Sequence, residues 1–140
     1  MKNFIEAVQY AFAALGGAVG AVMGGFDGFL YALIVFVVVD YLTGIMAAIL
    51  NKRLSSEVGF KGICRKVLIF VLVGMANILD MHVIGTGCVL RTAVLFFYIS
   101  NEGVSVLENA GHLGLPVPAR LLNVLEQLHE DAEQEDIDNE

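Results

Sequence analysis

The feature that most constrains this chain is the near absence of charged residues over long stretches. Ala7 to Phe26 contains no charged residue, and Gly28 to Asn51 contains Asp40 alone. A helix crosses about 30 Å of hydrocarbon with roughly 20 residues at about 1.5 Å each, so both stretches are long enough to span a membrane. The composition, 57% hydrophobic and 16% charged, agrees, because a soluble chain of this length needs charged surface on all sides. The lipid bilayer is therefore the expected solvent.

Two further stretches are candidate spans, and each contains one ionisable residue. They run over about 67–83, with Asp80, and about 87–100, with Arg91. The expected fold is an all-α integral membrane protein with about four transmembrane helices. Two alternatives stay open for the first stretch: it lies flat at the membrane interface, which leaves three spans, or it is cleaved as a signal peptide.

The charges are distributed unevenly along the chain. Residues 1–125 contain seven acids and eight bases, a net of +1, whereas the last fifteen residues contribute −8 to the total of −7. Five bases follow the second stretch: Lys52, Arg53, Lys61, Arg65 and Lys66. We expect these bases in a loop, which the positive-inside rule places in the cytoplasm, and with four spans both termini lie there too. Because the membrane explains this basic cluster, we expect no nucleic-acid binding.

The sequence after the spans divides into two parts. Pro118 suits the first turn of a helix, and the apolar residues after it repeat at helical spacing. These are Leu121, Val124, Leu125 and Leu128. The acidic end has no apolar periodicity, which predicts disorder. We therefore expect a transmembrane helical domain over 1–110, a cytoplasmic amphipathic segment over 111–129 and a disordered acidic tail over 130–140.

Small residues recur every four positions in the first stretch, where Gly16, Gly20 and Gly24 form GxxxGxxxG. Such spacing lets another helix backbone approach closely, and in lipid this packing drives helix association. The glycines predict helix packing, either between copies of the chain in a homo-oligomer or against helices of the same subunit.

Four polar residues lie inside the proposed spans: Asp40, Thr43, Asp80 and Arg91. Asp80 and Arg91 are equally far from the Gly85-Thr86 turn, which predicts an ion pair at one depth; the alternative is that each side chain reaches the outer interface separately. Asp40 lies near mid-bilayer with no base evident at its level. It is protonated, hydrogen-bonded to a neighbouring helix, or exposed to water in an assembled pore.

No pattern of catalytic or metal-binding residues is present in the sequence. Cys64 and Cys88 are too few for a disulfide framework, and GxSxG, HExxH, P-loop and CxxC motifs are absent. We therefore expect neither enzymatic activity nor a metal or other cofactor.

Several short motifs follow one another over residues 27–118. Asp40 precedes Thr43-Gly44, the basic segment comes next, and two polar runs follow it, over 101–109 and 114–118. In this order and spacing they resemble the toxin-secretion/phage-lysis holin family. The residues that carry this resemblance, besides Asp40 and the bases, are Gly44, Asn101, Glu102, Ser105, Glu108, Asn109, Pro116 and Pro118.

The resemblance implies a multi-pass bacteriophage protein of the bacterial (host) cytoplasmic membrane. Such a holin forms homo-oligomers and opens timed lesions, through which an endolysin reaches the cell wall and host cell lysis follows; relatives near toxin genes serve toxin secretion. The implied partners are the lipid bilayer, further copies of the chain, an endolysin by function, and an antiholin. The residues alone also fit a small ion channel or transporter, or an antiholin-like membrane regulator.

Overall fold

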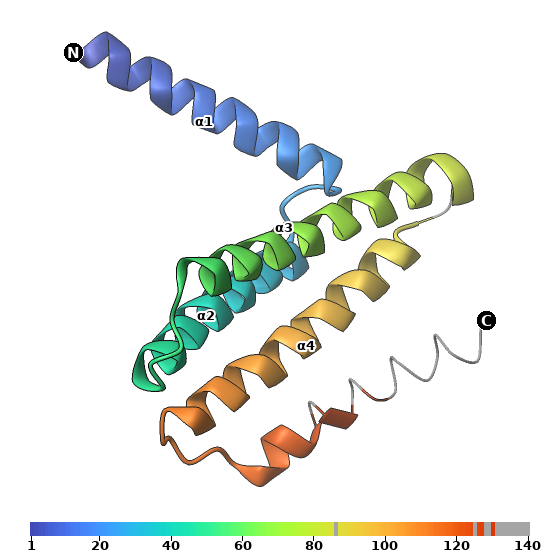
Figure 1. Cartoon of the computed structure of the whole chain (residues 1–140). Coiled ribbons are helices and arrows are strands. Elements are labelled where there is room, and N and C mark those ends of the chain that lie inside the picture. The colour runs from blue at the N-terminus through green and yellow to red at the C-terminus, as the bar shows by residue number, and fades with distance from the viewer. Residues whose placement is uncertain (86, 125, 128–129, 131–140) are drawn as a thin grey trace.

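The computed structural model describes residues 1–85, 87–124, 126–127 and 130 (Figure 1). Over these residues the chain forms four long helices: α1 (Lys2–Val22), α2 (Gly28–Leu50), α3 (Ser56–Leu79) and α4 (Val89–His112). A π-helical turn, η1 (Asp80–Ile84), continues α3, and residues 119–124 form a shorter helical segment. The acidic tail expected over 130–140 lies outside the described residues, apart from Glu130.

Three of the described helices are long and apolar enough to cross a membrane: α1, α2, and α3 together with η1 over Ser56–Ile84. The expected all-helical, multi-pass membrane protein is therefore supported by the fold. The segment expected to be a fourth span forms α4, which does not meet the same criterion. Its second half contains the polar run that includes Asn101 and Glu102.

Side-chain caps determine where α2 and α3 begin. The Asp27 carboxylate accepts a hydrogen bond from the Leu30 amide at 2.9 Å, and the Ser55 hydroxyl accepts one from the Val58 amide at 3.2 Å. Each cap satisfies an amide that has no partner within the first helical turn.

The Ser55 cap corrects one expectation about the basic segment. Because α3 begins at Ser56, Lys61, Arg65 and Lys66 lie within this helix, and the turn after α2 retains only Lys52 and Arg53. Three of the five bases are thus helical residues that project from one of the candidate spans.

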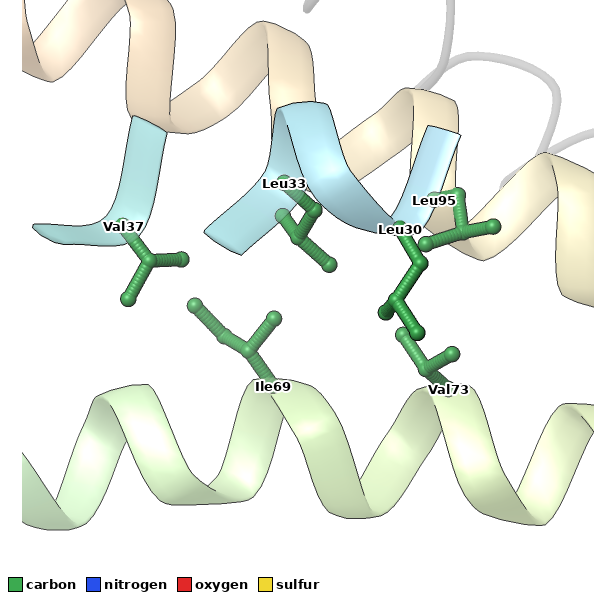
Figure 2. Packing of buried hydrophobic residues seen from close by; sticks show 6 residues of the cluster. All are labelled: Leu30, Leu33, Val37, Ile69, Val73 and Leu95. Carbon is green, nitrogen blue, oxygen red and sulfur yellow. The ribbon is translucent and has the colours of Figure 1, made fainter. Parts of the chain in front are cut away.

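The helices α2, α3 and α4 pack together around a small apolar core (Figure 2). Its buried residues come from all three helices: Leu30, Leu33 and Val37 of α2, Ile69 and Val73 of α3, and Leu95 of α4. Most other large apolar side chains of these helices face outward. An apolar exterior around a narrow core is what a bundle surrounded by lipid requires.

The helix α1 leaves this bundle and extends away from it (Figure 1). Of its residues only Gly20 is buried, because the Phe26 ring covers it, whereas Gly16 has open space around it. Gly24 lies beyond the helix end, with φ of 88°. The expected GxxxGxxxG ridge is therefore wrong at Gly24, which serves a turn and not a helix face.

Candidate functional site

The polar cluster of the bundle joins one charged side chain from each of the three packed helices. The ammonium of Lys66 in α3 donates to the carboxylates of Asp40 in α2 and Glu102 in α4. The side chains of Asp40, Glu102 and Lys66 are 10%, 4% and 18% exposed. We call these three residues the Lys66 cluster.

The register of the two helices explains why Asp40 meets Lys66. Asp40 lies ten residues before the end of α2 at Leu50 (50 − 40), and Lys66 lies ten residues after the start of α3 at Ser56 (66 − 56). Antiparallel helices joined by a short turn place such residues at one level. The expectation that no base lies level with Asp40 was wrong because Lys66 had been placed in a loop; the Ser55 cap is the signal that could have corrected it.

An amide on α4 completes the hydrogen bonding of Asp40. The Asn109 amide nitrogen lies 3.1 Å from the Asp40 carboxylate, 3.2 Å from the Asp40 carbonyl oxygen and 3.0 Å from the Thr43 hydroxyl. The Thr43 hydroxyl in turn donates to the Val39 carbonyl oxygen at 2.8 Å. Asp40 and Thr43, which were singled out as intramembrane polar residues, thus share one partner on α4.

A pocket of about 590 Å³ opens onto the Lys66 cluster. Its walls are partly apolar and come from α2, α3, α4 and the turn between α2 and α3. Besides Asp40, Arg65 and Lys66, five further residues that carried the family resemblance line it: Gly44, Asn101, Glu102, Ser105 and Asn109. Glu108, Pro116 and Pro118 are described residues that are not part of its lining. Scattered sequence motifs therefore come together around one charged cavity.

A second charged site lies at the opposite ends of these helices. The Arg91 guanidinium forms a two-pronged pair with the Asp27 carboxylate, at 2.7 and 3.3 Å. It also donates to the carbonyl oxygens of Met23, at 2.5 Å, and Gly25, at 3.1 Å. Arg91 thereby fastens the turn between α1 and α2 to the beginning of α4. We call this arrangement the Arg91 clamp.

The predicted ion pair between Asp80 and Arg91 is wrong in its partner. Asp80 is 1% exposed, and its carboxylate accepts hydrogen bonds from the backbone amides of Leu90, at 3.1 Å, and Arg91, at 2.8 Å. These amides belong to the first turn of α4, whose own N-cap residue makes no side-chain capping bond. Asp80 therefore caps α4 from η1, which leaves the Arg91 side chain for Asp27.

Two polar residues at this end of the bundle, Asn77 and Asp27, were missed by sequence reasoning. The Asn77 amide donates to the Val22 carbonyl oxygen at 2.9 Å and holds the end of α1 against α3. Asp27 was not singled out from the sequence, yet it accepts hydrogen bonds from Arg91 that lower the pKa of its carboxyl below the ordinary value. A Cβ atom at Gly24 would lie 2.6 Å from the Asn77 side-chain oxygen, so any larger residue there requires the Asn77 side chain to move.

The described residues contain no group of three His, Cys, Asp or Glu side chains that could hold a metal ion. The arrangement offers charged and polar side chains packed between helices, not a nucleophile with its base.

Comparison with known proteins agrees with the order of motifs. Residues 17–130 match the profile of the bacteriophage holin family. The chain belongs to this family. Among its relatives, a probable holin of Bacillus phage phi105 is 34% identical over 132 residues, which cover 94% of this chain and 90% of the relative. An uncharacterized 14.9 kDa protein in the nagH 3′ region of Clostridium perfringens is 38% identical over 92% of this chain and 98% of its own. No solved structure matches this family member.

Proposed function

We propose that this holin-family chain assembles in the bacterial cytoplasmic membrane and forms timed lesions that release an endolysin or a toxin. The observation that carries the proposal is the Lys66 cluster, which places three charged side chains inside a bundle whose exterior is apolar. Charged groups at such a position are costly unless they pair or meet water. Separation of the helices during assembly would turn this polar interior toward a water-filled lesion.

The proposed homo-oligomer forms through α1. This helix is apolar, nearly all of it is exposed, and the face that contains Gly16 has no neighbour in the described chain. Small residues permit close helix contacts in lipid, where packing replaces the hydrophobic effect. Gly20 contributes less, because Phe26 of the same chain already covers it.

The contacts of α1 between copies can be tested by disulfide crosslinking in membranes. Cys64 and Cys88 are both exposed, so they are first replaced by alanine. A cysteine at Gly16 should then give dimers on oxidation, whereas one at Ala18, which is exposed on the opposite face of α1, or at the covered Gly20 should give fewer. Equal yields at all three positions would argue against a specific α1 interface.

The proposed topology has the turn between α2 and α3 in the cytoplasm, since Lys52 and Arg53 lie there and further bases begin α3. With α4 as a fourth crossing, both termini are cytoplasmic. Residues 111–129 then form a segment at the inner face, and the acidic end lies in the cytoplasm, away from anionic lipid.

Lesion formation is tested by inducible expression in bacteria with and without a cytoplasmic endolysin. The proposal predicts abrupt loss of viability in both strains and lysis only in the strain with the endolysin. Slow ion leakage without release of protein would support a small channel or transporter instead. An unchanged membrane potential would support an antiholin-like regulator.

Alanine at Asp40 or at Glu102 should change the time of lesion formation, because each substitution removes one of the two carboxyl groups that hold Lys66 between the helices. Glu57→Ala provides the matched control, since this carboxylate is exposed and lies outside the cluster. If both cluster variants keep wild-type timing, these residues have no part in the lesion.

A further inference from the structure

The formal charges of the Lys66 cluster do not balance. Two carboxylates, Asp40 and Glu102, share the single ammonium of Lys66. With all three groups ionised the cluster has a net charge of −1, and the neighbouring hydrogen-bond donor, Asn109, is an uncharged amide. The Arg91 clamp differs in this respect, because one guanidinium meets one carboxylate there.

The other groups that face the pocket do not supply the missing positive charge. Tyr41 of α2 and Tyr98 of α4 line it, and a tyrosine side chain has no positively charged form. Arg65 of α3 also lines it, but within the described residues its guanidinium forms no ion pair with either carboxylate. The carboxylates themselves are almost fully buried.

A proton is the simplest cation that can balance such a cluster. A net charge buried in an apolar bundle is costly, and two carboxyl groups in contact with one ammonium titrate as one coupled system. A proton on either carboxyl leaves one ammonium and one carboxylate, which is neutral, and the protonated carboxyl gains an O–H donor.

We propose that the Asp40–Lys66–Glu102 cluster is a proton-binding site that holds one proton near pH 7 while α2, α3 and α4 are packed, and releases it to water when these helices separate. The proton passes from a carboxylic acid to bulk water, and the cluster changes from neutral to −1. This inference rests on the proposed function only for the step of helix separation; the bound proton belongs to the packed bundle itself.

The sign of the resulting pH dependence follows from the proton count. The packed state binds one more proton than the separated state, so low pH stabilises the packed bundle and high pH favours separation. With one proton exchanged, the equilibrium constant for separation changes by at most about tenfold per pH unit.

The bound proton is tested on the purified full-length protein in detergent by infrared spectroscopy, from the C=O stretch of protonated carboxyl groups. Solvated carboxylates are ionised above about pH 5. The wild-type chain should therefore keep a protonated-carboxyl band near pH 7 that shifts in D₂O. Absence of this band in the folded wild-type protein overturns the proposal, whether or not any variant folds.

Variants assign the band to the cluster. Asp40→Asn and Glu102→Gln each leave one ammonium with one carboxylate, so each should abolish the band near pH 7, whereas Glu57→Gln should retain it. If both cluster variants keep the band, the assignment of the proton to the cluster is overturned.

Dye release from vesicles of phosphatidylglycerol and phosphatidylethanolamine then tests the link to helix separation. Release by the wild-type protein should rise up to about tenfold per pH unit, and release by Glu102→Gln should be independent of pH. A protein that releases dye with no infrared band near pH 7 contradicts the proton site and leaves the lesion proposal standing. A protein with the band that releases no dye at any pH contradicts the lesion proposal and leaves the proton site standing.

Discussion

The two charged sites of the bundle use opposite solutions for a charge inside an apolar environment. The Arg91 clamp pairs one base with one acid, and the Asp27 side chain is 43% exposed. The Lys66 cluster pairs one base with two acids, both almost fully buried. The clamp joins the turn between α1 and α2 to α4, whereas the cluster joins α2, α3 and α4 to one another.

This difference assigns different tasks to the two ends of the bundle. A balanced pair that also binds carbonyl oxygens holds one geometry and has little dependence on pH. An unbalanced buried cluster is sensitive to protons, to water and to the distance between helices. We infer that the clamp directs α1 away from the bundle and that the cluster controls whether the bundle stays packed.

The largest difference between the two sites is expected for Lys66→Met, which leaves two buried carboxyl groups without a base. Removal of one partner from a buried ion pair costs about 3–5 kcal/mol, and we expect a loss of this size in the free energy of unfolding. Titration with SDS in mixed detergent micelles measures it. The loss should shrink as the pH falls, because both carboxyls can then be protonated.

Lys61→Met is the matched control for this substitution. Lys61 lies 3.2 Å from Glu57 in an exposed pair on the same helix, with side chains 68% and 78% exposed. Such helix-surface pairs contribute about 0.5 kcal/mol or less. Equal losses for the two methionine variants would contradict the buried cluster.

The second largest effect is expected for Arg91→Met in the clamp. The substitution removes the hydrogen bonds to Asp27 and to the carbonyl oxygens of Met23 and Gly25, which should cost about 2–3 kcal/mol. The loss should be smaller than for Lys66→Met because water can solvate the half-exposed Asp27. Arg91→Lys should recover only part of it, since an ammonium cannot reproduce the planar fork of guanidinium donors.

Hydrogen exchange in the turn after α1 tests the Arg91 clamp independently of the free energy of unfolding. If the clamp directs this helix, hydrogen exchange at the amides of residues 20–26 should increase in Arg91→Met and remain unchanged in Lys61→Met. Unchanged exchange in both variants would mean that the clamp does not hold the turn.

Two neighbouring glycines separate backbone strain from crowding within the clamp. Gly24 and Gly25 have φ of 88° and 93°, so alanine at either costs about 1–2 kcal/mol. Open space surrounds Gly25, whereas a Cβ at Gly24 would lie 2.7 Å from the Arg91 Nε atom. Gly24→Ala should therefore exceed Gly25→Ala by about 1 kcal/mol or more in the SDS titration. Equal costs would show that the Arg91 side chain can move aside.

The sequence predicted the helices well where long apolar runs were interrupted by turn residues. The boundaries of α2 and the turn that begins at Gly85 follow from local signals that tertiary contacts leave unchanged. The start of α3 did not, because a cluster of bases indicated a cytoplasmic loop while the Ser55 cap, a shorter signal, starts a helix there. Because this cap was missed, Lys66 was expected in a loop, whereas it lies in α3 and belongs to the polar cluster.

The candidate site was predictable in its residues and less so in its pairs. Asp40, Asp80 and Arg91 were singled out because charge in an apolar run is conspicuous, and Glu102 was singled out by the family resemblance. Their partners depend on how distant segments meet. Asp80 and Arg91 do lie close together, as their equal distance from the turn predicts. The Asp80 carboxylate, however, caps the N-terminus of α4, and the Arg91 side chain pairs with Asp27 in the turn between α1 and α2. Periodicity along one chain segment contains no information about either contact.

The smallest expected effect distinguishes the two sites by their response to acid. Hydrogen bonds from Arg91 hold the pKa of the Asp27 carboxyl below its ordinary value in the folded protein. The contribution of Asp27 to stability is therefore complete above the pKa of the unfolded chain and is lost only as the pH falls through the lower pKa of the folded state. Asp27→Asn should therefore cost an amount of stability that does not vary between about pH 5 and about pH 8. The free-energy difference between wild type and Asp27→Asn, followed over this range, checks it. The same measurement for Glu102→Gln should vary with pH, because wild type loses a bound proton as the pH rises and the variant has none to lose. A variation of equal size for Asp27→Asn would mean that acid acts on both sites, and the division of tasks between clamp and cluster would fail.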